Sequence, residues 1–198
     1  MSIDLSKRAF FRKAGKKVSE VVVEQVEKKA EVHKVNWFRP PFALNELEFM
    51  LTCMRCSDCI NACEFGVIFP LDESYGMKVA STPAMDLMNK SCHLCTDWPC
   101  VEACTYDALK RVPEETQCEE AQAAHQPLPM LANIAFDTER CLPFFGPECG
   151  FCATVCPVPG ALDLVENKPV VDQEKCVGCA QCRAACVTDP SSIQMQLL

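Results

Sequence analysis

The sequence predicts an α+β fold in which two pseudo-symmetric modules follow an N-terminal helix. Three observations support this prediction: a cysteine motif occurs four times, short hairpin-like stretches precede the later motifs, and the first 39 residues contain no cysteine. We therefore divide the chain into an N-terminal helical segment, residues 1–39, and a domain containing all four motifs, residues 40–198. We expect the N-terminal segment to dock onto a partner, and the alternative is a loose tail left from a signal-like sequence.

The N-terminal segment has apolar residues at helical spacing, among them Val18, Val22 and Val26, and Ser6 is a suitable N-cap. Arg39 precedes two prolines, which end the helical pattern. The segment lacks the apolar core of a secretory signal, and no stretch of the chain approaches the roughly 20 apolar residues that span a bilayer. We therefore expect a cytoplasmic, reduced protein with no transmembrane segment of its own, associated with a membrane only through a partner.

The net charge is −8, so the chain offers no basic surface for nucleic acid. Sixteen of the 17 cysteines form four motifs. The first and fourth motifs keep the C-x2-C-x2-C-x3-C spacing of bacterial ferredoxins, whereas the second and third carry insertions. In chain order the motifs are Cys53, Cys56, Cys59 and Cys63; Cys92, Cys95, Cys100 and Cys104; Cys141, Cys149, Cys152 and Cys156; and Cys176, Cys179, Cys182 and Cys186.

The stretches between the motifs also repeat. Residues 161–164 and 168–172 predict a hairpin leading to the fourth motif, and residues 134–137 hold the same place before the third. Residues 112–130, which are rich in glutamate and include Pro127 and Pro129, predict a surface insertion.

The motif spacing indicates iron–sulfur clusters. In a ferredoxin motif the first three cysteines bind one cubane and the fourth binds the neighbouring cluster, so two motifs make one pair of clusters. Zinc would need only two C-x2-C halves at each site, and disulfides require an oxidising compartment. The sixteen cysteines therefore predict four [4Fe–4S] clusters as iron-bound cofactors, and no catalytic residues are evident.

Three residues near the motifs have two interpretations each. Cys118 lies outside every motif, beside Glu119, and is either a structural thiol or a redox-active one. His93, inside the second motif, is either an exposed loop residue or a group that tunes a cluster. Trp98 in the same motif is expected to shape the loop and shield a cluster from water, with a direct part in the electron path as the alternative.

Residues 42–198 resemble the NapG/MauM-type ferredoxins and, more distantly, the iron–sulfur subunits of dimethyl sulfoxide reductase-class molybdoenzymes. The segment from Cys92 to Cys104 is similar to the second motif of that family, and the segment from Cys141 to Pro157 is similar to its third. The first motif is similar to that of the NapF ferredoxins, which are cytoplasmic.

The resemblance implies nested pairing, in which motifs one and four share one pair of clusters and motifs two and three share the other. Linker length alone favours tandem pairing, in which neighbouring motifs share a pair of clusters, because the shortest connector joins motifs three and four. The implied ligand sets are Cys53, Cys56, Cys59 and Cys186; Cys176, Cys179, Cys182 and Cys63; Cys92, Cys95, Cys100 and Cys156; and Cys141, Cys149, Cys152 and Cys104.

The resemblance implies a one-electron relay rather than an enzyme. The expected partners are redox proteins in a hetero-oligomer, namely a quinone-linked membrane subunit or a molybdoenzyme or dehydrogenase. The alternative is an accessory ferredoxin that assists maturation or reactivation of a molybdoenzyme. A catalytic iron–sulfur enzyme would need an iron left open by a missing cysteine, which sixteen matched cysteines disfavour.

The chain departs from the family pattern in two places. Residues 6–13 resemble a twin-arginine signal in which Lys7 replaces the first arginine and the following apolar stretch is missing. The proline usual after the fourth cysteine of a motif occurs only at Pro157, and Glu64, Thr105 and Val187 occupy the other three places.

Overall fold

The computed structural model describes residues 37–111 and 128–198, which belong to one compact unit beginning at Trp37. The expected N-terminal helix and Cys118 lie outside the described residues, as do the residues that resemble a twin-arginine signal and most of the expected surface insertion. Within the described part, no helix is long and apolar enough to cross a membrane.

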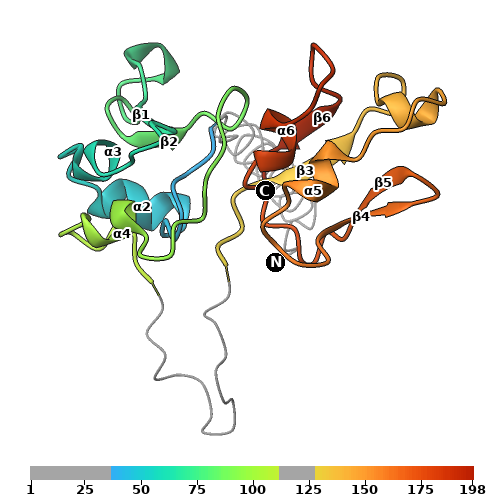
Figure 1. Ribbon diagram of the computed structural model, residues 1–198. Coiled ribbons are helices and arrows are strands. Elements are labelled where there is room, and N and C mark those ends of the chain that lie inside the picture. Colours follow the sequence, from blue (N-terminus) through green and yellow to red (C-terminus); the bar gives the residue numbers. More distant parts are fainter. Residues whose placement is uncertain (1–36, 112–127) are drawn as a thin grey trace, which may run out of the picture. The chain divides into compact units, whose positions relative to one another are not determined.

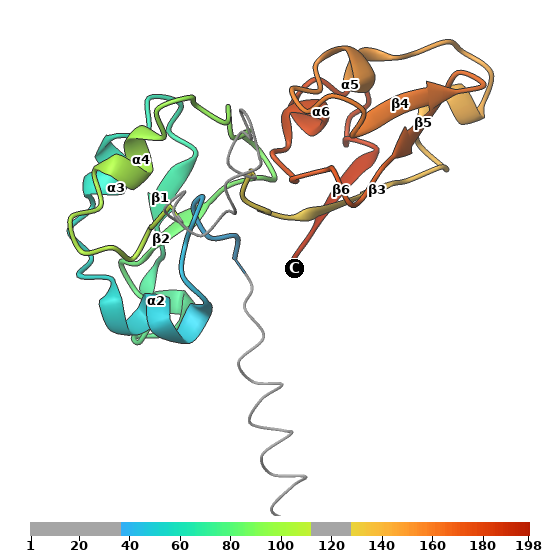
Figure 2. The ribbon, with the colours of Figure 1, turned by 90° about the horizontal axis from the view of Figure 1, so that it is seen from below.

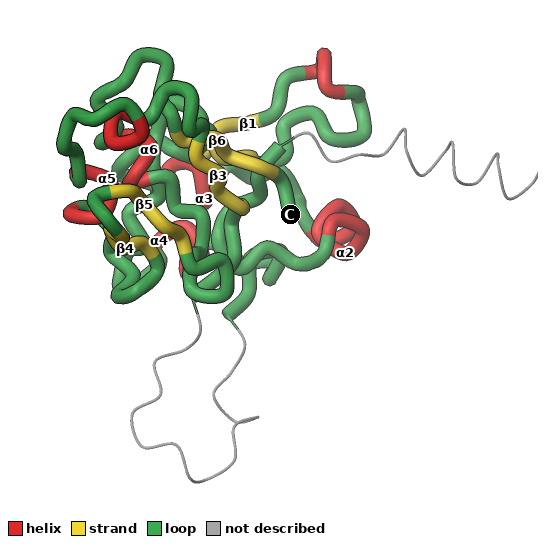
Figure 3. The backbone as a smooth tube through the Cα atoms, turned by 90° about the vertical axis from the view of Figure 1, so that its right-hand side faces the viewer, coloured by secondary structure: helices red, strands yellow, loops and turns green. Residues whose placement is uncertain are grey.

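The described chain mixes short helices with short strands, as the α+β prediction required, and loops connect them over much of its length (Figure 3). The first half contains α2 (Glu46–Thr52), α3 (Asp58–Asn61), β1 (Ile68–Pro70), η1 (Glu73–Tyr75), β2 (Pro83–Met85) and α4 (Pro99–Glu102) (Figure 1). The second half contains β3 (Asn133–Phe136), η3 (Leu142–Phe144), α5 (Phe151–Thr154), β4 (Leu162–Val165), β5 (Lys168–Val171), α6 (Gln181–Ala184) and β6 (Ile193–Gln196).

Three antiparallel sheets of two strands each are formed by the described residues. The hairpin predicted before the fourth motif is confirmed as β4 and β5, with Leu164 opposite Pro169. The stretch before the third motif is β3, and it pairs with β6, which follows the fourth motif (Figure 2). The β3–β6 pair therefore closes the second half of the domain around motifs three and four.

The first half closes in the same way. β1 and β2 pair between the first and second motifs, and an isolated bridge joins Ala43, before the first motif, to Leu109, after the second. Phe49 of α2 is fully buried, and Trp98 packs its ring edge-on against Phe42 at 5.0 Å. The strands are too short to be stable alone, so these sheets depend on the packing around the cysteine motifs.

Arg39 connects the start of the described chain to α2 and β2. Its guanidinium donates to both carboxylate oxygens of Glu46, at 2.9 and 2.6 Å, and to the carbonyl oxygen of Pro83 at 2.7 Å. The guanidinium carbon also lies 4.5 Å from the centre of the Phe49 ring. Because the Arg39 side chain is only 11% exposed, these charge-assisted bonds are shielded from competing water.

Replacing Arg39 with methionine should destabilise the domain by about 2 kcal/mol, because Glu46 and the Pro83 carbonyl would lose their donor. The melting temperature followed by circular dichroism should fall by about 4 to 8 °C. Arg140, which is 53% exposed and pairs with Asp137, provides the control, because Arg140→Met removes only a surface ion pair. Equal shifts in the two variants would contradict the role given to Arg39.

Candidate metal centres

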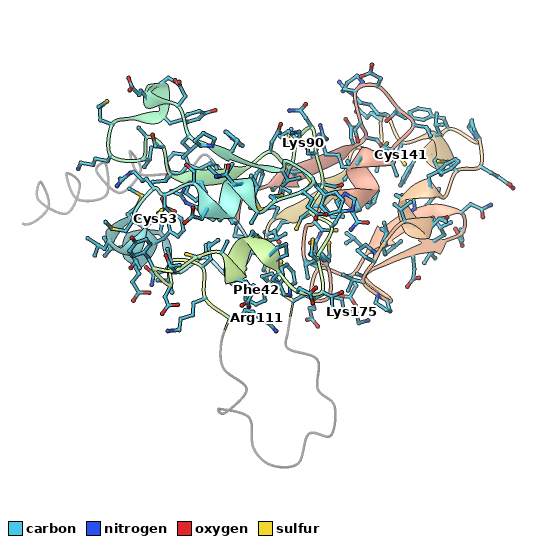
Figure 4. The ribbon with its side chains drawn as sticks, turned by 60° about the vertical axis from the view of Figure 1, so that its left-hand side comes forward. Phe42, Cys53, Lys90, Arg111, Cys141 and Lys175 are labelled. Carbon is cyan, nitrogen blue, oxygen red and sulfur yellow. The ribbon has the colours of Figure 1, made fainter. Side chains whose placement is uncertain are left out.

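Four hollows in the described part of the chain are each lined by four cysteine side chains. We name them sites A to D, and Figure 4 labels one cysteine of site A and one of site D. Site A contains Cys53, Cys56, Cys59 and Cys104; site B contains Cys63, Cys92, Cys95 and Cys100; site C contains Cys156, Cys176, Cys179 and Cys182; and site D contains Cys141, Cys149, Cys152 and Cys186.

Each site takes three cysteines from one motif and the fourth from another. The structure thus brings together all sixteen predicted cysteines, and the exchange of the fourth cysteine follows the ferredoxin rule. The expected nested pairing, however, is wrong. Motif one exchanges its last cysteine with motif two, and motif three exchanges with motif four.

The helices explain this tandem pairing. α3 of the first motif packs against α4 of the second, and α5 of the third packs against α6 of the fourth. In each half, pairing between the residues that flank the two motifs holds them together: the Ala43–Leu109 bridge in the first half and the β3–β6 pair in the second. The short connector between motifs three and four forms the β4–β5 hairpin, which leaves those two motifs side by side.

The loops around the cysteines adopt a left-handed backbone. Arg55, Leu94 and Gly178 precede the second cysteines of their motifs and have φ of 56°, 49° and 67°. This conformation costs a non-glycine residue roughly 1 kcal/mol or more. It turns backbone N–H groups towards sulfur: the N–H of Leu94 faces Cys92, and that of Gly178 faces Cys176.

Gly178 is required for a second reason. A Cβ atom at this position would lie 2.0 Å from the carbonyl oxygen of Ala132, and the neighbouring Val177 carbonyl accepts a hydrogen bond from the Leu131 N–H at 2.8 Å. Only glycine lets the segment that leads into β3 approach the loop of site C this closely.

The third cysteines of motifs one, two and four are the most strongly perturbed. Burial, together with repulsion from neighbouring cysteines, raises the pKa of Cys59, Cys100 and Cys182 to about 12. Without a bound cation these thiols are therefore neutral at pH 7.

Cys56 and Cys186 have side-chain neighbours that set them apart. The N–H of Asp58 lowers the pKa of Cys56, but burial and the Asp58 carboxylate raise it, and the net shift is upward. Burial would raise the pKa of Cys186, yet hydrogen bonds from Ser192, Thr188 and Ser191 outweigh it and lower the pKa to about 6. Sequence reasoning missed Thr188 and Ser192, because neither belongs to the cysteine spacing.

Two hydrogen bonds connect site B with site C. The N–H of Cys92 donates to the carbonyl oxygen of Cys179 at 2.8 Å, and the Gln181 side-chain amide donates to the Cys92 carbonyl oxygen at 3.1 Å. A cysteine of the second motif therefore lies directly against a cysteine of the fourth.

His93 and Trp98 both line site B. The ring of His93 stacks on that of Phe65 with 3.6 Å between centres, and His93 is exposed. Trp98 is 7% exposed and forms part of the apolar wall.

No group of three or more His, Cys, Asp or Glu side chains within residues 37–111 and 128–198 converges on one position that a single metal ion could occupy. In a cubane each thiolate binds a different iron atom, so its cysteines surround a hollow instead of meeting at a point. Sites A to D have this arrangement, and an all-thiol donor set fits the cluster.

Replacing cysteines in pairs distinguishes tandem from nested pairing. Cys59 and Cys104 share site A, so the double variant Cys59→Ala/Cys104→Ala should lose one cluster, which is about 4 of about 16 iron atoms. The matched variant Cys59→Ala/Cys63→Ala disrupts sites A and B and should lose about 8. Anaerobic iron analysis provides the measurement. Equal losses of iron from the two variants would contradict tandem pairing and support nested pairing.

Comparison with known proteins agrees with these centres. Residues 133–187 match a 4Fe-4S dicluster domain. The chain is 32% identical to the methylamine utilization ferredoxin-type protein MauM of Methylobacillus flagellatus over 166 residues, which cover 79% of this chain and 67% of that protein.

Two further relatives come from other groups of ferredoxin-type proteins. Identity to the ferredoxin-type protein NapG of Haemophilus influenzae is 31%, covering 79% of this chain and 57% of the relative. Identity to the ferredoxin-type protein NapF of Escherichia coli is 27%, covering 76% of this chain and 80% of the relative. No solved structure matches the chain. The cysteine motifs, the dicluster domain and these relatives together show that the chain belongs to the NapG/MauM family of ferredoxin-type iron–sulfur proteins.

Proposed function

We propose that sites A to D each hold one [4Fe–4S] cluster and that the chain relays single electrons through them. The observation that carries the proposal is the exchange of cysteines between motifs, because it gives every site four thiols and leaves none of the sixteen over. The pairings α3–α4 and α5–α6 also support two pseudo-symmetric modules, each with two clusters.

The clusters would supply the one-electron chemistry, and the chain would position and tune them. Burial keeps Cys59, Cys100 and Cys182 protonated in the free protein, so iron binding must release their protons. Apolar walls such as Trp98 exclude water from the sites, and backbone N–H groups facing the sulfurs stabilise negative charge on them.

The hydrogen bond between Cys92 and Cys179 supports the order A–B–C–D for the relay. Sites A and B share motifs one and two, and sites C and D share motifs three and four. The Cys92–Cys179 contact supplies the one remaining link, between B and C. An electron entering at one end would therefore pass through both inner sites before leaving.

Anaerobically purified protein should contain about 16 iron atoms and about 16 acid-labile sulfides per chain, as four cubanes require. Dithionite should bleach its visible absorbance, because the clusters accept electrons. A value near 8 would mean that only one pair of sites is loaded, which would overturn the four-cluster proposal. Zinc in place of iron would overturn the assignment of the metal.

We further propose that the chain works as a subunit or dedicated partner of a redox complex, either with a quinone-linked membrane subunit or with a molybdoenzyme or dehydrogenase. In support, the relative MauM is named as a ferredoxin-type protein of methylamine utilization. The N-terminal segment is the proposed docking element.

An anaerobic affinity purification from the native cell tests the partner proposal, with full-length protein and a chain beginning at Trp37 as the two baits. Full-length bait should recover a redox subunit that the shorter bait does not. Since the described unit begins at Trp37, the shorter chain keeps all four sites. Recovery of no redox protein with either bait would contradict a stable complex.

A further inference from the structure

Site D differs from the other sites in the side chains that approach its sulfur atoms. The Thr188 hydroxyl oxygen lies 3.2 Å from the Cys186 sulfur, and the Ser192 hydroxyl oxygen lies 3.4 Å from the same sulfur. Ser192 is 2% exposed, so water does not compete for its hydroxyl. Within residues 37–111 and 128–198, side-chain hydroxyl groups form hydrogen bonds with a cysteine sulfur only at site D.

The direction of these hydrogen bonds follows from the chemistry of the groups. A sulfur that binds iron has no proton, so both hydroxyl groups must donate to it. The Thr188 oxygen already accepts a hydrogen bond from the backbone N–H of Ser192 at 2.9 Å, which leaves its own hydrogen available for Cys186. The backbone thus holds the Thr188 hydroxyl in place.

The corresponding positions elsewhere provide no such donor. Two residues after the last cysteine of motifs one, two and three stand Phe65, Tyr106 and Val158, where the fourth motif has Thr188. None of these three side chains forms a hydrogen bond with a sulfur in the described residues. At site A, the side chain beside Cys56 is instead the Asp58 carboxylate, which carries negative charge.

A donor and a negative charge have opposite effects on a cluster. Reduction adds an electron, so a hydroxyl that donates to a ligand sulfur stabilises the reduced form and raises the reduction potential. A nearby carboxylate repels the added electron and lowers the potential.

We propose that Thr188 and Ser192 make site D the centre of highest potential, and therefore the end of the relay at which electrons collect. This inference rests on the proposed clusters. Thr188 and Ser192 are positioning residues, since they act through Cys186 and donate to its sulfur.

A potentiometric titration followed by electron paramagnetic resonance tests this inference on the full chain. Thr188→Val and Ser192→Ala should each shift the highest midpoint to a lower potential and leave the other midpoints in place, and the double variant should shift it further. Thr188→Ser keeps the hydroxyl and should keep the wild-type midpoint. Thr154→Val is the matched control, because the Thr154 hydroxyl near site D donates to the Gly150 carbonyl oxygen and not to a sulfur.

The variant Cys186→Ala tests which midpoint belongs to site D, because it removes a cysteine of that site alone. It should lose about 4 iron atoms and the highest midpoint. If Thr188→Val or Ser192→Ala loses the site D cluster, that variant should likewise lose about 4 iron atoms and the highest midpoint. Loss of a different midpoint would overturn the inference.

Iron analysis separates failure of the inference from failure of the proposed function. If the wild-type protein contained no iron and no sulfide, the proposed clusters themselves would be ruled out. Fully loaded Thr188→Val and Ser192→Ala variants with unchanged midpoints would overturn only the tuning role of the two hydroxyl groups.

Discussion

The exchange of a cysteine between neighbouring motifs is the constraint on which the described domain depends. Two-stranded sheets and four-residue helices bury little apolar surface and have little stability alone. When Cys104 completes site A and Cys63 completes site B, two segments far apart in the sequence are held against one another. Binding of the proposed clusters would then contribute directly to the free energy of folding, because the sites do not exist in the unfolded chain.

The same constraint accounts for the unfavourable backbone conformations. Arg55 and Leu94 adopt positive φ values that side chains disfavour. At Leu94 this conformation places the backbone N–H close to the Cys92 thiol, which burial makes expensive to ionise, so the local strain there is offset by stabilisation of charge on sulfur. The backbone of the loops therefore follows from the charge that the cysteines must carry.

The cysteine spacing and the residue pattern between the motifs predicted the α+β class, the hairpin of β4 and β5, and the sixteen cysteines that gather into four sites, because spacing and periodicity are local properties. It did not predict which motifs pair. Linker length indicated that motifs three and four are partners, and the family resemblance led to the opposite choice. The outcome depends on the pairing of β3 with β6 across the whole second half, which no local pattern encodes. The sulfur contacts of Thr188 and Ser192 depend equally on three-dimensional placement.

Tandem pairing also changes what the contact between the two halves must accomplish. Nested pairing would link the halves through shared cysteines, whereas tandem pairing leaves each half with its own two sites. The hydrogen bond from Cys92 to Cys179 then becomes the shortest connection between them, and Arg183 of α6 strengthens the contact by donating to the Met88 carbonyl oxygen at 2.9 Å. Sites A and D remain at the ends, and of the sixteen cysteines only Cys56 of site A is exposed. In the proposed relay, an exposed cysteine beside a carboxylate at one end, and sulfurs hydrogen-bonded to hydroxyl groups at the other, would favour electron entry at site A and exit at site D.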